Sequence, residues 1–398
     1  MRHGLLAVTR TDLADPAAAR TGALAHIART ALGAVPAVAV SGTTGAGLDA
    51  LRSEIAALVA RLPVPDPAAD VRLWVDRSFT IRGAGTVVTG TLPAGTLRTG
   101  DELELAGGRR VRVRGLQALG EDRAAVSGVA RVALNLRGVD HREVSRGDAL
   151  LTAGRWRLSS ALDVALRNAA DLPTELVLHL GSAAVPARVR PLGAGIARLA
   201  LARPLPLRVG DRGLLRDPGR HRIAAGLQVL DIASPALSRR GAAALRAADL
   251  AAALRTPHPT EASGPAAAAG GAPGPAGAPD VLPGVPLAEL HLRHRGFAAE
   301  TELAAMGLPA AGVPVAGWLA DQARWAALQA QVEPAYDQWR SRHPLAAGMP
   351  ADALRRSLGV PDPALLGVLA KAAWSSRTAW YAVAGRSGCP PHCPSRSP

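Results

Sequence analysis

The first 62 residues alternate between short apolar runs and longer stretches in which apolar residues recur at helical spacing. The apolar runs at residues 4–9 and 34–42 are typical of buried strands, and the stretches at residues 15–33 and 47–62 are typical of helices. A strand–helix–strand–helix order predicts a parallel sheet covered by helices. Because only two strands are present and such a sheet normally has more, we expect residues 1–62 to be one end of an α/β domain.

After a Pro-rich connection at residues 62–70, the pattern changes to short runs rich in Val, Leu and Thr. Turn residues separate these runs about every ten positions, which is typical of short antiparallel strands. Strands of this length and spacing predict a small closed barrel. Because the pattern occurs twice, we predict one β-barrel at residues 70–153 and a second at residues 157–235.

The remaining part of the chain has mainly helical patterns. Residues 238–254 predict a helix, and residues 256–286 consist largely of Pro, Gly and Ala, which predicts a linker without a core. Residues 287–383 show mostly short helical patterns, and we expect small helical modules of the winged-helix kind there, incomplete in number. We predict no structure from about residue 375 onward.

The formal net charge is +14, and nearly all of the basic residues are arginines, Lys371 being the only lysine. A positive excess of this size indicates a polyanionic partner, for which nucleic acid is the simplest choice. An abundance of Arg, Ala, Gly and Pro is also typical of proteins from GC-rich genomes. Codon usage is therefore an alternative source of part of the charge.

The two cysteines, Cys389 and Cys393, lie in a Pro-rich tail, "CPPHC". Two cysteines exclude a framework of several disulfides, and this tail does not supply a complete zinc site. The sequence contains no apolar run of the ~20 residues that a membrane-spanning helix needs, and it does not begin with a signal peptide. We therefore predict a cytoplasmic protein with no membrane partner.

The stretch "WVDRSFTIRGAGTVVTG", residues 74–90, contains three glycines among β-branched residues. A dinucleotide-binding loop of the G-x-G-x-x-G kind opens a helix, whose N-terminus holds the pyrophosphate. Here the residues after Gly83 and Gly85 are strand-like, so no such helix N-terminus follows. We therefore predict that these glycines form a tight turn in the first barrel.

The same stretch resembles the start of the second domain of the translational GTPases of the elongation factor Tu class. Further resemblances to that class lie at residues 129–151 for the second domain, and at residues 209–217 and 226–232 for the third domain. Together the resemblance covers roughly residues 5–235. It implies that residues 1–62 are the C-terminal part of a P-loop GTPase domain, and that two β-barrel domains follow.

Elongation factor Tu ends after its second barrel, whereas this chain continues through a linker into helical modules. This extension and the "HLGSA" motif at residues 179–183 resemble the bacterial selenocysteine-specific elongation factors of the SelB type. The resemblance implies a factor that binds GTP and selenocysteyl-tRNA and delivers this tRNA to the ribosome at recoded UGA codons. In that family, winged-helix modules dock on a hairpin in the messenger RNA, and we expect the pair of modules that makes this contact to be missing from this sequence.

The resemblance implies that residues 1–62 contain the guanine-binding part of a GTPase domain. Its first part is the T-R-T-D motif, in which a carboxylate accepts hydrogen bonds from two guanine N–H groups and an arginine stem lies against the base. Its second part is the S-G-T motif, in which a backbone N–H contacts the base. The implied residues are Thr9, Arg10, Asp12, Ser41, Gly42 and Thr43. A helix N-cap is the alternative role for Asp12.

For the amino-acid pocket, the resemblance implies Asp76, Arg77 and Arg131 in the first barrel. A selenol is more acidic than a thiol and is an anion near neutral pH, so two guanidinium groups would favour it over the neutral hydroxyl of serine. Asp76 would orient an arginine or receive the aminoacyl ammonium group. The alternative for all three residues is an ordinary ion pair on the barrel surface.

Other basic residues are candidates for contact with tRNA phosphates, although solvated arginines are an equally open interpretation. These are Arg109, Arg110, Arg112, Arg114, Arg216, Arg220, His221, Arg222, Arg239 and Arg240. Alternation along a strand predicts that Arg110, Arg112 and Arg114 share one face.

The family uses GTP and GDP with Mg²⁺, but several of its motifs do not occur in these 398 residues. They are the Walker-type loop, the Mg²⁺-binding switch threonine, the D-x-x-G motif and the catalytic histidine after it. We therefore expect a chain that is incomplete at both ends, assign no catalytic or metal-binding residue, and leave GTPase activity open. The alternatives are a non-enzymatic RNA-binding relic and another translational GTPase of the elongation factor Tu class.

Overall fold

The computed structural model describes residues 3–255 and 284–373, apart from residues 31, 84, 168, 170, 171, 194 and 347. The chain divides into two compact units, residues 1–66 and residues 67–398. Most of the predicted linker, residues 256–283, and the cysteine-containing tail lie outside the described residues. Among the described residues, no helix is long and apolar enough to cross a membrane.

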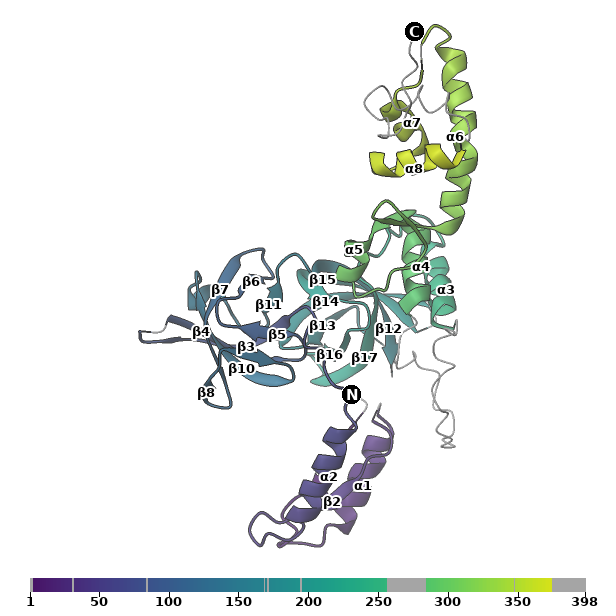
Figure 1. Cartoon of the computed structure of the whole chain (residues 1–398). Helices are drawn as coiled ribbons and strands as arrows, with labels where there is room; N and C mark the ends of the chain where they lie inside the picture. Colours follow the sequence, from purple (N-terminus) through teal and green to yellow (C-terminus); the bar gives the residue numbers. More distant parts are fainter. Residues whose placement is uncertain are drawn as a thin grey trace. The chain divides into compact units, whose positions relative to one another are not determined.

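The N-terminal unit contains the predicted order of strand, helix, strand and helix (Figure 1). These elements are β1 (Leu6–Val8), α1 (Ala17–Ala28), β2 (Ala37–Ala39) and α2 (Leu48–Ala60). The two strands are parallel, with Leu6 opposite Ala37. Since both strands run in the same direction, their C-terminal ends meet at one edge of the sheet, and the loops that follow them lie close together.

The first barrel of the larger unit is formed by six antiparallel strands in the order β10-β4-β3-β11-β6-β7, and pairing of β7 with β10 closes it. They are β3 (Arg72–Ile81), β4 (Gly85–Leu92), β6 (Glu102–Leu105), β7 (Arg110–Ala118), β10 (Ala130–Arg137) and β11 (Ala149–Thr152). The short strand β8 (Glu121–Asp122) pairs antiparallel with the end of β7. β5 (Thr96–Arg98) pairs with β9 (Ala125–Ser127), and a 3₁₀ turn, η1, spans His141–Glu143.

Alternation of apolar and polar residues determines which face of each strand lies inside this barrel. In β7, Val111 and Val113 are buried, and the arginines at positions 110, 112 and 114 are exposed on one face, as the sequence predicts. The turn between β3 and β4 contains Gly83 and Gly85, with φ of +83° and +92°. This confirms the prediction that the glycines form a turn, because β4 begins at Gly85 and no helix follows.

The second barrel is a closed sheet of six antiparallel strands in the order β12-β15-β14-β13-β16-β17. They are β12 (Arg157–Arg167), β13 (Glu175–Leu180), β14 (Ala183–Gly193), β15 (Ile196–Leu207), β16 (Arg212–Asp217) and β17 (Arg222–Asp231). Two barrels were predicted, and both are present.

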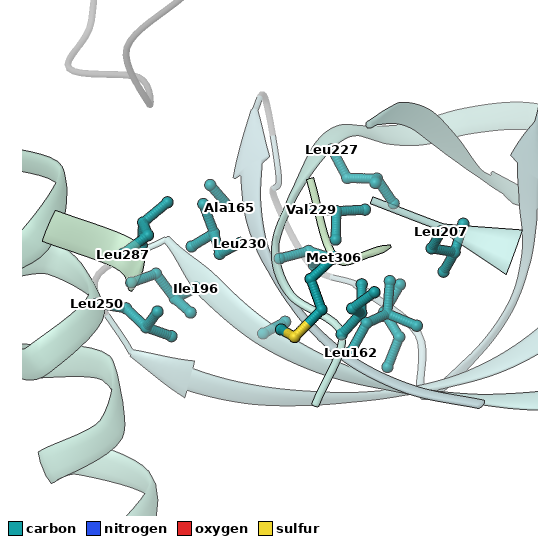
Figure 2. Close-up of a cluster of buried hydrophobic side chains, with 14 of the residues drawn as sticks. Leu162, Ala165, Ile196, Leu207, Leu227, Val229, Leu230, Leu250, Leu287 and Met306 are labelled. Carbon is teal, nitrogen blue, oxygen red and sulfur yellow. The ribbon is translucent and has the colours of Figure 1, made fainter. Parts of the chain in front are cut away.

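The core of the second barrel continues into the helices that follow it. Figure 2 shows Leu162, Leu227 and Val229 of the barrel in one apolar cluster with Leu250 and Met306. The helical partners belong to α3 (Ala242–Arg255), α4 (Gly284–Arg295) and α5 (Glu300–Ala305) with the turn after it. α4 begins at Gly284, so the last three residues of the predicted linker range form its first turn.

A second helical core lies further along the chain. A three-stranded sheet, β18-β20-β19, packs with α6 (Gln322–Arg342), α7 (Ala351–Leu358) and α8 (Pro363–Ala373). The strands are β18 (Phe297–Ala299), β19 (Val313–Val315) and β20 (Trp318–Ala320).

The expectation of mostly short helices in this part is wrong for α6, which runs for 21 residues and passes through Pro334. A proline inside a helix costs ~3 kcal/mol. Burial of Trp325, Leu328 and Val332 along one face of α6 offsets this cost, because all three contribute to the core of the module.

Candidate functional site

Asp76 occupies a β-bulge in the first barrel. The β3–β4 register runs from the pair Val75–Gly90 directly to the pair Arg77–Thr89, so Asp76 is an extra residue on β3. A bulge changes the direction of the side chain at the inserted position. Gly90 permits the close approach at this point, because a Cβ there would lie 2.5 Å from the backbone oxygen of Trp74.

Arg131 reaches Asp76 from β10, which lies on the other side of β4. Its Nη2 donates to Asp76 Oδ1 at 2.8 Å, and its Nη1 donates to Asp76 Oδ2. The ion pair is therefore bidentate, with both guanidinium amino groups on the two carboxylate oxygens.

Thr89 of β4 lies between the two charged groups. Its hydroxyl donates to Asp76 Oδ1 at 2.7 Å and accepts from Arg131 Nη2 at 3.3 Å. The three side chains form a closed hydrogen-bonded set on the outer face of the barrel, which we call the Asp76 cluster. Of its members, Thr89 was not among the residues implied by the sequence.

The charges of the Asp76 cluster reinforce each other. The hydrogen bond from Arg131, together with that from Thr89 and the nearby charge of Arg77, lowers the pKa of Asp76 against the opposing effect of burial. In turn, the hydrogen bond to Asp76 raises the pKa of Arg131. Both groups are therefore charged at neutral pH. Arg77, the third implied residue, is exposed, and its side chain makes no hydrogen bond to the other described residues.

The cluster is open to solvent on one side. The side chain of Asp76 is 22% exposed, and that of Arg131 is 51% exposed. The site thus presents one carboxylate and two guanidinium groups, one of them unpaired, on an accessible strand face. Such a set can bind a ligand that carries a positive and a negative group a short distance apart.

The candidate guanine-binding residues follow β1 and β2, whose C-terminal ends lie at the same edge of the sheet. Ser41 is fully buried, and its hydroxyl donates to Asp12 Oδ1 at 2.5 Å. The Oγ of Ser41 also accepts the N–H groups of Thr43 and Thr44, both at 3.2 Å. Ser41 therefore fixes the loop after β2 and holds the exposed carboxylate of Asp12.

The remaining hydrogen-bonding capacity at this edge lies at two groups. The second carboxylate oxygen of Asp12 has no described hydrogen-bond partner, and neither has the backbone N–H of Gly42. The N–H of Thr43, in contrast, already donates to Ser41 Oγ. A Cβ at Gly42 would meet nothing within 4 Å. Thr9 and Arg10 are exposed before Asp12, and Arg10 has a φ of +59°. The free oxygen of Asp12 can accept hydrogen bonds from a planar ring that has adjacent N–H donors, and the N–H of Gly42 can donate to an acceptor on such a ring.

The other basic candidates differ in their surroundings. Arg109 pairs with Glu143, and Arg110 with Glu102 at 2.6 Å. Arg112 and Arg114 line a cavity at one end of the first barrel. In the second barrel, the candidates cluster at the β16–β17 hairpin, where Arg220, His221 and Arg222 are exposed. Arg239 and Arg240 lie after the barrel, before α3, and are also exposed.

Two known families match the barrels. Residues 85–151 match the family described as elongation factor Tu domain 2. Residues 159–236 match the family described as the beta-barrel domain of the selenocysteine-specific elongation factor.

Curated relatives carry the same description. The chain is 34% identical over 250 residues to "Selenocysteine-specific elongation factor" of Desulfomicrobium baculatum. The aligned segment covers 58% of this chain and 39% of that protein. It is 35% identical over 204 residues to the protein of the same name from Escherichia coli (strain K12), covering 50% of this chain and 33% of that protein. The chain therefore spans less than half the length of these relatives.

Solved structures share the fold. A bacterial selenocysteine-specific elongation factor EF-Sec has a TM-score of 0.72 at 19% identity, covering 93% of this chain and 59% of the other. The SelB of Methanococcus maripaludis, solved in complex with the GTP analogue GPPNHP, has a TM-score of 0.51 at 22% identity, covering 57% of this chain and 59% of the other.

Two consecutive barrels, the first of which matches elongation factor Tu domain 2, give the chain the barrel arrangement of the translation elongation factor class. Within that class, the match of the second barrel and the curated relatives identify it as a homologue of the selenocysteine-specific elongation factors of the SelB type. The family predicted from the sequence is thus confirmed.

Proposed function

We propose that this chain binds selenocysteyl-tRNA and that the Asp76 cluster, with Arg77, reads the aminoacyl group. The observation that carries the proposal is the arrangement of Asp76, Arg131 and Thr89 on an open strand face, with a further guanidinium beside them. The names of the relatives support selenocysteine as the amino acid.

The physical basis is charge. A selenocysteine side chain is an anion near neutral pH and accepts charge-assisted hydrogen bonds from guanidinium groups, whereas a seryl hydroxyl is neutral. One or two such bonds are worth about 2–4 kcal/mol. This difference corresponds to roughly 30- to 1000-fold discrimination against seryl-tRNA.

We further propose that the edge formed by Asp12 and Gly42 binds the guanine base of GTP or GDP. Asp12 would accept from two adjacent guanine N–H groups, and the N–H of Gly42 would donate to the guanine oxygen. Ser41 orients the carboxylate through its 2.5 Å hydrogen bond, and the stem of Arg10 would lie against the ring. A bound GTP would supply the nucleotide control of tRNA affinity that is usual in this class.

The wider role follows from the family. We propose that the factor acts in the cytoplasm and delivers selenocysteyl-tRNA to the ribosome at recoded UGA codons. The exposed arginines of both barrels would contact tRNA phosphates, a contribution that is the same for every aminoacyl group.

The proposal is tested by protection of the aminoacyl ester. Selenocysteyl-tRNA and seryl-tRNA are incubated with the 398-residue chain, and the rate of spontaneous ester hydrolysis is followed as protein concentration rises. We expect the selenocysteyl ester to be protected at concentrations at least ~30-fold lower. Arg131→Gln should remove most of this preference.

Arg110→Gln is the matched control, because Arg110 also pairs with a carboxylate on the same barrel but lies outside the Asp76 cluster. It should change protection of both esters by the same factor or not at all. Equal protection of the two esters by the unmodified chain would show that the chain binds RNA without reading the amino acid.

A further inference from the structure

The guanidinium group of Arg131 already has a partner when no ligand is bound. Both of its terminal nitrogens donate to Asp76, and one also donates to Thr89. An anion that enters the site therefore meets a neutralised pair at Arg131, and only Arg77 offers an unpaired positive charge. Three of the five N–H groups of its guanidinium go to Asp76 and Thr89. Recognition of an anionic side chain by both terminal nitrogens of Arg131 therefore requires this ion pair to open.

The two partners differ in freedom. Asp76 is held in the bulge of β3, has a side chain that is only 22% exposed, and keeps a second hydrogen bond from Thr89 at 2.7 Å. Arg131 is a long side chain with half of its surface exposed. When the pair opens, Arg131 is the group that moves and Asp76 the group that stays.

We propose that the pair opens by exchange of partners: the α-ammonium group of the aminoacyl ester replaces Arg131 on Asp76, and Arg131 moves onto the anionic side chain of the same ligand. Thr89 is the positioning residue that holds Asp76 through the exchange. This inference rests on the proposed function and adds a condition to it. The site responds to a ligand that carries both charges at once.

Counting ion pairs shows why this arrangement is selective. The closed site has one pair. A selenocysteyl ester with a free ammonium group leaves two pairs, a net gain of one. A seryl ester would give Asp76 a new partner but leave the Arg131 charge unpaired, and an N-acylated selenocysteyl ester would pair Arg131 but leave Asp76 unpaired. Neither gains a pair through the exchange, so neither opens the site, and the N-acylated ester is left with Arg77 alone.

Thr89 fits its role because of its position and its chemistry. A β-branched side chain on a strand has few χ1 rotamers, and its hydroxyl has one hydrogen to donate, which goes to Asp76. The hydroxyl oxygen of Thr89 also accepts a hydrogen bond from Arg131. When Arg131 leaves in the exchange, this bond is lost, but the bond from Thr89 to Asp76 remains.

The experiment uses stable analogues of the tRNA terminus, in which selenocysteine, N-acetyl-selenocysteine or serine is joined to 3′-amino-3′-deoxyadenosine through an amide. Their dissociation constants for the 398-residue chain are measured by calorimetry under reducing conditions. We expect the free selenocysteine analogue to bind at least ~10-fold more tightly than either of the others.

Asp76→Asn gives the decisive result, because it removes the carboxylate and leaves Arg131 unpaired. Exchange predicts that this variant binds the N-acetyl analogue about 3- to 10-fold more tightly than the unmodified chain does. A site in which Arg131 does not move predicts only the smaller gain that comes from removing a repulsive carboxylate, and an affinity gain of less than ~3-fold would overturn the exchange. Glu102→Gln is the matched control, since it frees Arg110 on the same barrel and should leave all three affinities unchanged.

Thr89→Val and Thr89→Ser test the positioning role. The valine variant should reduce the preference for the free ammonium group at least ~3-fold, and the serine variant, which keeps the hydroxyl, should restore it. An effect of both variants alike would refute a role for the hydroxyl. If no analogue binds to the unmodified chain or to Asp76→Asn, the proposed function itself fails, a result distinct from binding without exchange.

Discussion

Arg246 provides the clearest test of the energetics that join α3 to the second barrel. Its side chain is 2% exposed, its Nε donates to Asp163 Oδ2 at 2.8 Å, and its Nη2 donates to Asp231. Asp163 is fully buried and also binds Arg198 at 2.7 and 3.0 Å. One arginine of α3 thus neutralises carboxylates on two barrel strands.

The perturbation is Arg246→Met, which keeps an unbranched apolar stem and removes the charge. Removal of one partner from a buried ion pair costs about 3–5 kcal/mol. We expect the lower end, about 3 kcal/mol, because Asp163 keeps Arg198 and Asp231 keeps the N–H of Ala233 at 2.7 Å. This loss corresponds to an increase of about 100-fold in the local opening equilibrium.

Hydrogen exchange resolved to peptides of α3 and β17 measures this change, since a chain of several modules does not unfold in one step. Arg110→Met is the matched control, because the pair of Arg110 with Glu102 is exposed and worth less than ~1 kcal/mol. Adding Asp231→Asn to Arg246→Met should cost little more, since the two groups act together. An increase of less than ~5-fold in α3 exchange, or fully additive effects, would refute the reasoning.

Three further predictions concern the first barrel and α6. The lowered pKa of Asp76 means that its ionised form stabilises the fold at neutral pH, and that this contribution disappears as the pH falls through a value below 3.8. The carboxyl carbon resonance of Asp76 should therefore titrate below the ordinary range of an aspartate, and Arg131→Gln should move the midpoint upward; an unchanged midpoint would exclude the ion pair. Gly90→Ala should destabilise the first barrel by more than ~2 kcal/mol in urea unfolding, because its Cβ would meet the backbone oxygen of Trp74 at 2.5 Å. Pro334→Ala should stabilise the module of α6 by about 1–3 kcal/mol, since Pro334 is exposed inside the helix, and a lower melting temperature would contradict this account.

Local patterns were enough to predict much of this fold. Alternation of apolar residues and the spacing of turns predict both barrels, because a half-buried strand shows its orientation in every second residue. The three small strands β18, β19 and β20 have three residues each and carry too little periodicity to be recognised. The length of α6 was missed because Pro334 is a local signal for a helix end, whereas burial of Leu328 and Val332 is a tertiary effect.

The candidate site was predictable only in part. The resemblance implied Asp76 and Arg131, and these residues do lie in contact. The bulge and the role of Thr89 were missed, since both depend on the register between β3 and β4. A shift of one residue decides which side chain faces Asp76, and a single sequence does not contain that information.

The shared core of the second barrel and its helices has a consequence for how this chain can be divided. The segment that matches the family barrel ends at residue 236, yet Leu250, Leu287 and Met306 complete the apolar cluster around Leu230 and Val229. A protein shortened to that segment would expose this surface to water and would tend to associate through it. Because the core is shared, we expect the second barrel and α3 to move as one body, and any hinge of the described chain to lie elsewhere.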